Sequence, residues 1–165
     1  MIEEKYVRPT ITDEEFEKIR SNFELGYKAI KEVRCPYFTG PVVFNAMGLE
    51  HLKFMRKNHA RPRNEQLLRM RLFPLAPEIV SLSQTIQGIT YTKHFENLRT
   101  NQRYQSILLP VYYYEFVAIL KDKRVRVVIK QIEDGPRFFW SIIPFWKIDK
   151  NTNRRKMSYG NPEID

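Results

Sequence analysis

The fold is decided by residues 109–147, which read LPVYYYEFVAILKDKRVRVVIKQIEDGPRFFWSIIPFWK. This stretch contains three runs rich in aromatic and β-branched residues, the types that are enriched in strands. The runs cover residues 109–120, 124–132 and 137–147. A polar turn at Asp122-Lys123 separates the first two, and Asp134-Gly135 is a strong hairpin signal between the last two. The pattern predicts an antiparallel sheet, which a strand at residues 89–95 extends beyond a polar loop at 96–106.

The first half of the chain has helical rather than strand periodicity. The predicted helices cover residues 13–34, 47–56, 65–73 and 77–83. The first begins with a capping box formed by Thr12 and Glu15, and it is expected to end before Cys35-Pro36 because the residue before a proline resists the helical conformation. Asn64 is expected to cap the third helix, and Pro77 suits the first turn of the fourth.

Helices that precede strands, instead of alternating with them, indicate an α+β fold. We therefore expect N-terminal helices packed on a C-terminal antiparallel β-sheet of about four strands. A chain of 165 residues fits one domain, which we place at residues 1–148. Residues 149–165 are polar, include Arg154-Arg155-Lys156, and are expected to form a loose basic tail.

Composition restricts the partners and the compartment. The chain has 28 Lys and Arg residues against 19 Asp and Glu residues, a formal net charge of +9, and such a charge favours polyanions as partners. Cys35 is the single cysteine, so no internal disulfide forms, which suits a reducing compartment. No apolar run is long enough to span a bilayer, and residues 1–10 do not have the pattern of a signal peptide. We expect a cytoplasmic protein without a membrane partner, although a toxin secreted by another route would have the same pattern.

The strongest local signal is a basic segment at residues 53–71. Its cations are Lys53, Arg56, Lys57, Arg61, Arg63, Arg69 and Arg71, and only Glu65 opposes them. Such a run neutralises several phosphates and gains affinity from counterion release. By itself, such a run is more typical of a solvated helix face. The net charge and the sheet favour nucleic acid, with Arg61 and Arg63 presented from a loop that Pro62 stiffens.

Charged residues also occur inside the predicted strands. Glu115 and Lys130 interrupt runs that are otherwise half-buried, and a charge in that position needs a partner or a use. One interpretation is an ordinary cross-strand ion pair. The other is a polar site on an open sheet face, where Trp140, Trp146 and Lys147 would help to hold unpaired bases. Simple alternation places Phe139 and Ser141 on one face of the last strand, and Phe138, Trp140, Ile142 and Trp146 on the other.

The residues favour metal-free chemistry. The single cysteine and the three scattered histidines have no zinc spacing, and no glycine-rich phosphate loop or hydrolase elbow is present. We therefore expect no cofactor and no metal site. Metal-free RNA cleavage is compatible with the residues present, because the RNA 2′-hydroxyl is an internal nucleophile. His51 or Glu115 could accept its proton, and arginine or lysine could stabilise the charge that develops on phosphorus.

Two motifs resemble a known family. Residues 44–54 read FNAMGLEHLKF and resemble the helix-opening stretch of barnase–EndoU–colicin–RelE-like nucleases, and residues 139–147 resemble the last-strand motif of the same superfamily. The resemblance implies helices followed by a curved antiparallel sheet. It also implies a metal-independent ribonuclease of the kind used in toxin–antitoxin pairs and phage conflicts. Carried over by position, it indicates His51, Lys53 and Ser141 as catalytic residues.

The main hypothesis is therefore a toxin-like endoribonuclease that cuts RNA by 2′-hydroxyl attack. Its candidate catalytic residues are His51, Lys53, Glu115 and Ser141. Its candidate nucleic-acid contacts are Arg61, Arg63, Arg69, Arg71, Lys130, Trp140, Trp146 and Lys147. Two alternatives remain: a non-catalytic RNA-binding or ribosome-associated module, and a domain whose basic face docks an acidic partner such as an antitoxin or immunity protein. The geometry of the candidate residues distinguishes the enzyme from the two alternatives. Only an enzyme requires His51, an arginine of residues 61–71, and Glu115 or Ser141 to meet in one cleft.

Overall fold

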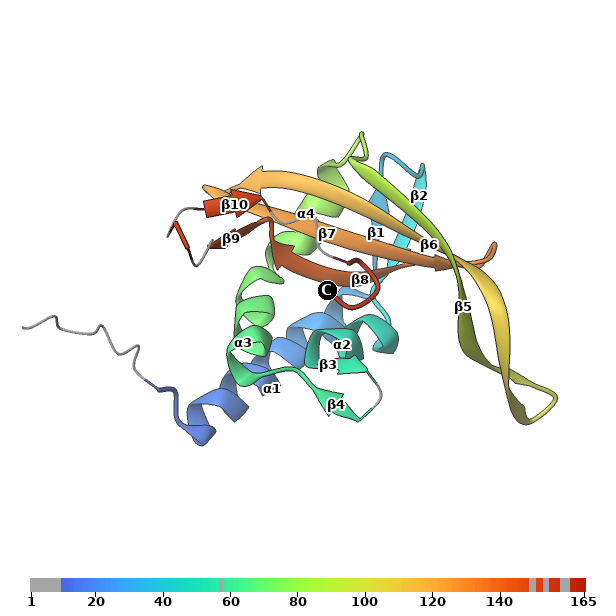
Figure 1. Ribbon diagram of the computed structural model, residues 1–165, viewed down its shortest axis with the longest axis horizontal. Coiled ribbons are helices and arrows are strands. Elements are labelled where there is room, and N and C mark those ends of the chain that lie inside the picture. Colours follow the sequence, from blue (N-terminus) through green and yellow to red (C-terminus); the bar gives the residue numbers. More distant parts are fainter. Residues whose placement is uncertain (1–9, 57, 149–150, 153–154, 158–160) are drawn as a thin grey trace, which may run out of the picture.

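The structure is a computed structural model that describes residues 10–56, 58–148, 151–152, 155–157 and 161–165. Within those residues, the description leaves out the side chains of residues 98, 100, 146–148 and 155–157. The described residues form an α+β fold with four helices and a mostly antiparallel main sheet, as predicted. Figure 1 shows the sheet as one curved layer, with α1, α2 and α3 below it in this view. No helix among the described residues is long and apolar enough to cross a membrane.

The main sheet has six strands, so the prediction of about four is wrong. Its order is β1-β2-β8-β7-β6-β5. The four expected strands correspond to β5 (Gly88–Thr100), β6 (Arg103–Leu120), β7 (Lys123–Ile132) and β8 (Arg137–Pro144). The two additional strands are β1 (Glu32–Cys35) and β2 (Gly40–Val43), which form an antiparallel hairpin. β2 joins β8 in parallel at the pair Val43 and Phe138, a long-range contact with no local signature.

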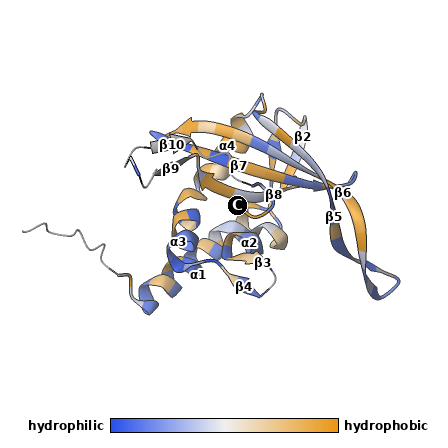
Figure 2. Cartoon of the chain, in the orientation of Figure 1, coloured by the Kyte–Doolittle hydropathy of each residue, from blue (hydrophilic) through white to orange (hydrophobic). Residues whose placement is uncertain are grey.

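β5 and β6 are longer than expected and form a protruding hairpin. The predicted loop at residues 96–106 is wrong, since pairing continues to Thr100 and Arg103 around a turn of Asn101 and Gln102. Both turn residues have positive φ, 47° and 66°, as a two-residue hairpin turn requires. The strand ends are polar, so their pairing rests on main-chain hydrogen bonds rather than on an apolar face. Figure 2 shows polar residues at the tip of this hairpin and apolar residues along the body of β6 and β7.

The helices are α1 (Asp13–Ile30), α2 (Ala46–Lys53), α3 (Arg63–Leu72) and α4 (Leu75–Leu82). The capping box of α1 is confirmed: the Thr12 hydroxyl accepts from the Glu15 main-chain N–H, and the Glu15 carboxylate accepts from that of Thr12. The helix ends earlier than expected, because Lys31 has a φ of 62° and β1 begins at the next residue. Asn45 caps α2, whereas α3 begins after Pro62 without a side-chain cap, so the expected cap at Asn64 is wrong.

Two short strand pairs complete the described fold. β3 (Phe54–Arg56) pairs with β4 (His59–Ala60), so α2 ends at Lys53 and not at the expected residue 56. β9 (Trp146–Ile148) pairs with β10 (Arg155–Met157). The last strand, expected at residues 137–147, is therefore two strands, β8 and β9. The main core contains buried side chains from all four helices and from β1, β2, β6, β7 and β8. It therefore fixes the position of α2 and α3 relative to β8, and these are the elements that carry the site described next.

Candidate functional site

A β-bulge in β8 determines which side chains reach the open face of the sheet. Val128 of β7 lies opposite Ser141, whereas the next residue, Ile129, lies opposite Phe139. Trp140 is therefore the extra residue of a bulge, and the alternation predicted for β8 is wrong beyond this point. Phe139 and Ile142 both enter the main core, while Trp140 packs on the opposite face with Tyr113 and Val128. Ser141 shares that face because it is paired with Val128.

Three charged residues of β6 and β7 lie on the same face. Glu115 is paired with Val128, and Arg126 and Lys130 lie two residues to either side of Val128 along β7. Arg126 Nη1 is 3.6 Å from a Glu115 carboxylate oxygen. Lys130 Nζ is 2.9 Å from Glu96 Oε1 and 4.2 Å from the centre of the Trp140 ring. The cross-strand Glu115–Lys130 pair that the sequence left open is therefore not formed, because each residue has another partner.

α2 places His51 directly over Trp140. The two rings stack with their centres 3.8 Å apart and an angle of 17° between their planes. His51 is only 5% exposed. Since α2 packs against β8, the helix holds the imidazole at the edge of the open sheet face. The structure thus brings together His51 of the motif at residues 44–54 and Trp140 of the strand predicted at residues 137–147.

Arg61 lies beside His51, although it precedes α3 in a connecting segment. Its Nε donates to the main-chain oxygen of His51 at 2.9 Å, and its Nη2 is 3.1 Å from His51 Nε2. The Gln66 side chain donates to the Arg61 main-chain oxygen at 2.8 Å, which fixes the segment. The Arg61 side chain is 1% exposed, so this guanidinium is held in one place rather than presented from a mobile loop.

Arg69 reaches the same face from α3. Its Nη1 donates to the Ser141 hydroxyl at 2.5 Å, and both residues are buried. Burial, the main cause, together with the charge of Arg61, lowers the pKa of Arg69 to about 9. The guanidinium still carries its charge at neutral pH. His51, two of the four predicted arginines, Ser141, Lys130 and Trp140 thus lie around one site, and Arg126 extends it towards Glu115.

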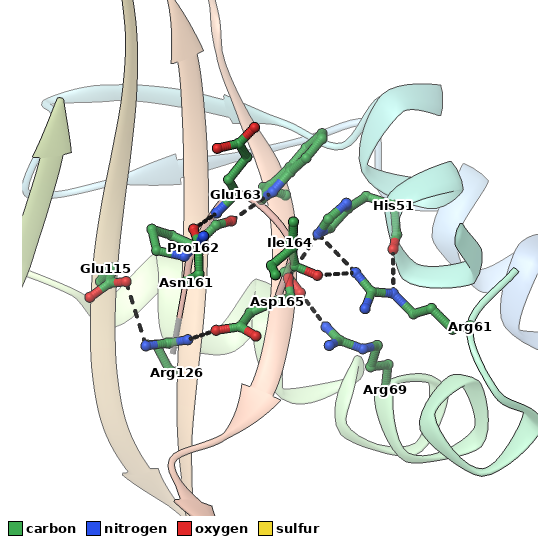
Figure 3. A network of polar contacts seen from close by, with 12 residues as sticks. His51, Arg61, Arg69, Glu115, Arg126, Asn161, Pro162, Glu163, Ile164 and Asp165 are labelled. Atoms are coloured by element: carbon green, nitrogen blue, oxygen red, sulfur yellow. Dashed lines mark hydrogen bonds and ion pairs between the residues drawn. The ribbon is translucent and has the colours of Figure 1, made fainter. Parts of the chain in front are cut away.

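Residues 161–165 occupy this site, although they belong to the stretch predicted to be a loose tail (Figure 3). Main-chain oxygens of the segment accept from Trp140 Nε1 at 3.0 Å and from Arg61 Nη2 at 2.9 Å, and that of Asp165 lies 2.7 Å from His51 Nε2. The Asp165 carboxylate accepts from Arg126 Nη2 at 2.9 Å. The Glu163 carboxylate is 2.5 Å from His94 Nε2. These are long-range contacts, which local sequence patterns do not encode.

The contacts of His51 define its protonation state. A main-chain oxygen only accepts hydrogen bonds, so His51 Nε2 carries the proton and donates to that of Asp165. The nearby Arg61 nitrogen is then a close cationic neighbour rather than a donor to the same atom. Burial, followed by the charges of Arg61, Arg69 and Lys130, lowers the pKa of His51 to about 3, against an opposing contribution from the bond to Asp165. The imidazole is therefore neutral at physiological pH.

We expect the ring resonances of His51 to stay at their neutral positions from pH 8 to pH 5, as followed by nitrogen-15 NMR. The unfolded chain takes up this proton near the ordinary pKa of about 6.5. The folded state therefore loses stability as the pH falls from that value towards 3, by at most about 1.4 kcal/mol per pH unit. A His51→Gln variant lacks this contribution and should show a flatter dependence. A His51 resonance that titrates near pH 6 in the wild type would contradict the buried, neutral assignment.

Three of the predicted site residues lie elsewhere. Lys53 pairs with Glu24 and Glu50, each at 3.1 Å, at the contact between α1 and α2. Arg63 pairs with Asp13 at 2.7 Å and lies over the Phe16 ring. Arg71 is exposed and borders a hollow between α1, α3 and α4. The side chains of Trp146 and Lys147 lie outside the described residues.

Sequence reasoning did not select two residues of the site. Arg126 is 1% exposed and contacts Glu115 and Asp165, and its alternation with valines in β7 was the available signal. Tyr113 lies on the same face, also 1% exposed, and its hydroxyl has no hydrogen-bond partner among the described residues. Burial, with smaller contributions from Glu163 and Glu96, raises the pKa of Tyr113, so the phenol remains a hydrogen-bond donor at neutral pH.

A pocket opens beside the stacked His51 and Trp140 rings. Its volume is about 500 Å³. Its remaining lining is mainly apolar and comes from α2 and the β3–β4 region, with Met47, Phe54 and Met55 as the larger apolar side chains. An aromatic ring next to a partly apolar pocket is suited to a flat ligand such as a nucleobase.

Comparison of the chain with protein-family models, curated proteins and solved structures finds no match.

Proposed function

We propose that this protein is a metal-independent endoribonuclease, related in chemistry to the barnase–EndoU–colicin–RelE-like nucleases. The observation that supports it is the meeting of His51, Arg61, Arg69 and Ser141 at one site. Arg126 connects this site to Glu115. A basic patch that only attracts RNA needs exposed cations, whereas these arginines are buried and fixed by hydrogen bonds. Fixed cations stabilise a developing charge without having to reorganise.

The residues divide into two roles in this proposal. The guanidinium groups of Arg61, Arg69 and Arg126 surround the reacting phosphate, with Lys130 beside them. The pocket lined by Trp140, Met47, Phe54 and Met55 holds a base of the unpaired RNA strand. Lys53, Arg63 and Arg71 contribute only to the overall positive charge, since their side chains are directed elsewhere.

The proposed reaction needs one proton acceptor. The ribose 2′-oxygen bonds to phosphorus and the bond from phosphorus to the 5′-oxygen breaks, which leaves a 2′,3′-cyclic phosphate. His51 accepts the 2′-hydroxyl proton, and the departing 5′-oxygen takes a proton from water. This requires the tautomer with a free lone pair on Nε2, and the ring can adopt it once the hydrogen bond to Asp165 is broken. Release of residues 161–165 also exposes the ring to water, which raises its basicity.

The direct test is incubation of the purified full chain with total RNA, alone and with ribosomes, in EDTA. We expect cleavage fragments that carry 2′,3′-cyclic phosphate and 5′-hydroxyl ends, since attack by the 2′-hydroxyl gives only these. A substrate with 2′-deoxyribose at the cleaved position should remain intact. Absence of cleavage under every condition would remove the enzyme proposal, and tight, salt-dependent binding without cleavage would favour the RNA-binding or ribosome-associated module.

Arg63→Ala provides the matched control for this assay. It removes one positive charge from the same segment, but Arg63 lies against Asp13 and Phe16 rather than in the site. We expect its cleavage rate to stay within about twofold of the wild type, because one phosphate contact or less is lost. A larger loss would indicate a diffuse basic surface instead of a built site.

One observation favours a second candidate function, the docking of an acidic protein partner. The site already holds a peptide segment, and two of its residues, Glu163 and Asp165, are acidic. An antitoxin or immunity protein with a similar acidic segment could bind in the same way. In the main proposal such a protein would be the inhibitor of a toxin that acts on RNA in the cytoplasm.

A further inference from the structure

Residues 161–165 present oxygen atoms to nitrogen atoms of the site. The segment contributes the main-chain oxygens of Pro162, Ile164 and Asp165 and the carboxylates of Glu163 and Asp165. The facing nitrogens belong to Trp140, Arg61, His51, His94 and Arg126. An RNA backbone also presents mainly oxygen acceptors, some of them charged. The segment therefore satisfies the site with the chemistry expected of the proposed substrate.

The Asp165 carboxylate has the central position in this arrangement. It bonds to Arg126, and Figure 3 shows it between that residue on one side and Arg61 and Arg69 on the other. Its negative charge also acts on Arg61 and Arg69: burial lowers the pKa of both groups, and Asp165 opposes that shift. An anion at this point thus interacts with all three guanidinium groups.

The segment is held by polar contacts more than by apolar burial. Of its five residues only Pro162 is buried, whereas Asn161 is exposed and the other three are partly exposed. Hydrophobic stabilisation depends on the apolar area removed from water, so release of the segment sacrifices little of it. The cations underneath are different, because Arg61, Arg69 and Arg126 are each less than 10% exposed. Without the Asp165 carboxylate these three guanidinium groups have fewer anionic partners, which raises the free energy of the folded state. Glu65 and Glu115 offset only part of this charge, so an anion in the site is favoured over an empty site.

We propose that Arg61, Arg69 and Arg126 form a binding site for a backbone phosphate of RNA, and that residues 161–165 are an intramolecular competitor whose Asp165 carboxylate lies where that phosphate binds. This inference rests on the proposed RNA-directed function and specifies its phosphate site. RNA and the segment exclude each other, so the measured affinity for RNA is the intrinsic affinity multiplied by the fraction of molecules in which the segment has left.

The test measures binding of a short 2′-O-methyl oligoribonucleotide, which lacks the attacking hydroxyl, at one fixed salt concentration. Asp165→Ala should bind this probe about tenfold more tightly than the wild type, because loss of the carboxylate shifts the population towards the open form. This substitution leaves the main-chain contacts of the segment in place. A chain shortened to residue 160 removes them as well and should bind at least as tightly as Asp165→Ala.

Asp122→Asn is the matched control, because it makes the same change in net charge. Asp122 is exposed in the turn between β6 and β7, with a φ of 61°, which asparagine tolerates. The affinity of Asp122→Asn for the oligoribonucleotide should match that of the wild type. This would show that the tighter binding of Asp165→Ala comes from the loss of this carboxylate and not from the change in net charge. Equal affinity in the wild type, Asp165→Ala, Asp122→Asn and the shortened chain would contradict the role of residues 161–165 as a competitor. Weaker binding by Asp165→Ala than by the wild type would contradict it as well. Failure of every protein, including the shortened chain, to bind RNA would overturn the proposed function itself.

Discussion

Arg61→Lys is expected to lower the rate of RNA cleavage by about 100-fold, the cost of losing one fixed donor to a developing negative charge. The substitution keeps the positive charge and removes the guanidinium fork. Arg61 uses that fork to donate to the main-chain oxygens of His51 and Ile164, and this holds its charge beside the His51 ring. A lysine ammonium is a single point and cannot hold these positions together.

The matched control for Arg61→Lys is Arg63→Lys, two residues further along the chain. Arg63 is half exposed and bonds to Asp13, so lysine in its place should leave the rate within about twofold of the wild type. The rates should be compared as single turnovers on one labelled oligoribonucleotide, well below the melting temperature of each variant. Because Arg61 also holds residues 161–165 through the Ile164 main-chain oxygen, the pair should be repeated in the chain shortened to residue 160, which lacks this segment. Equal rates for the two lysine variants in both backgrounds would place Arg61 outside the chemistry.

Gly48→Ala is expected to lower the free energy of unfolding by about 3 kcal/mol, a large cost for one methyl group. Gly48 lies where α2 meets β8. A Cβ atom there would overlap the main-chain oxygen of Phe139 and lie 2.6 Å from the Tyr27 hydroxyl. The Phe139 oxygen belongs to a strand of the main sheet, and Tyr27 is buried and bonded to the Asn45 main-chain oxygen. Neither can move cheaply, so α2 must shift away from β8.

Gly26→Ala is the control for this prediction. Gly26 lies on the exposed side of α1, and no heavy atom lies within 4 Å of the position of its Cβ. Alanine should therefore raise the free energy of unfolding by about 0.5–1 kcal/mol, the ordinary difference in helix propensity. Urea unfolding of the two variants measures both effects. If Gly48→Ala were as stable as the wild type, the close contact between α2 and β8 would be wrong, and with it the placement of His51 over Trp140.

The sequence determined the features that depend on neighbouring residues. The capping box of Thr12 and Glu15 and the strand character of residues 109–144 are local, so propensity and periodicity predict them. The turn expected at Asp122-Lys123 lies one residue earlier, at Lys121 and Asp122. The same patterns assigned residues 96–106 to a loop, because those residues are polar and the pairing of β5 with β6 is an interaction between main chains. The pairing of β1 with β2 and of β2 with β8 was not predicted for a related reason, since the place of this hairpin in the sheet depends on a single distant pair with β8.

The candidate site shows the same division. The sequence by itself determined that the chain is basic and that His51, Arg61, Arg69, Lys130, Trp140 and Ser141 deserve testing. It could not separate Arg61 from Arg63, since both flank Pro62 and differ only in what the folded chain brings near them. The tertiary structure alone decided this, together with the bulge that turns Trp140 and Ser141 to one face and the return of residues 161–165 to the site. These features join residues far apart in the chain, and their energies come from packing and charge that exist only after folding.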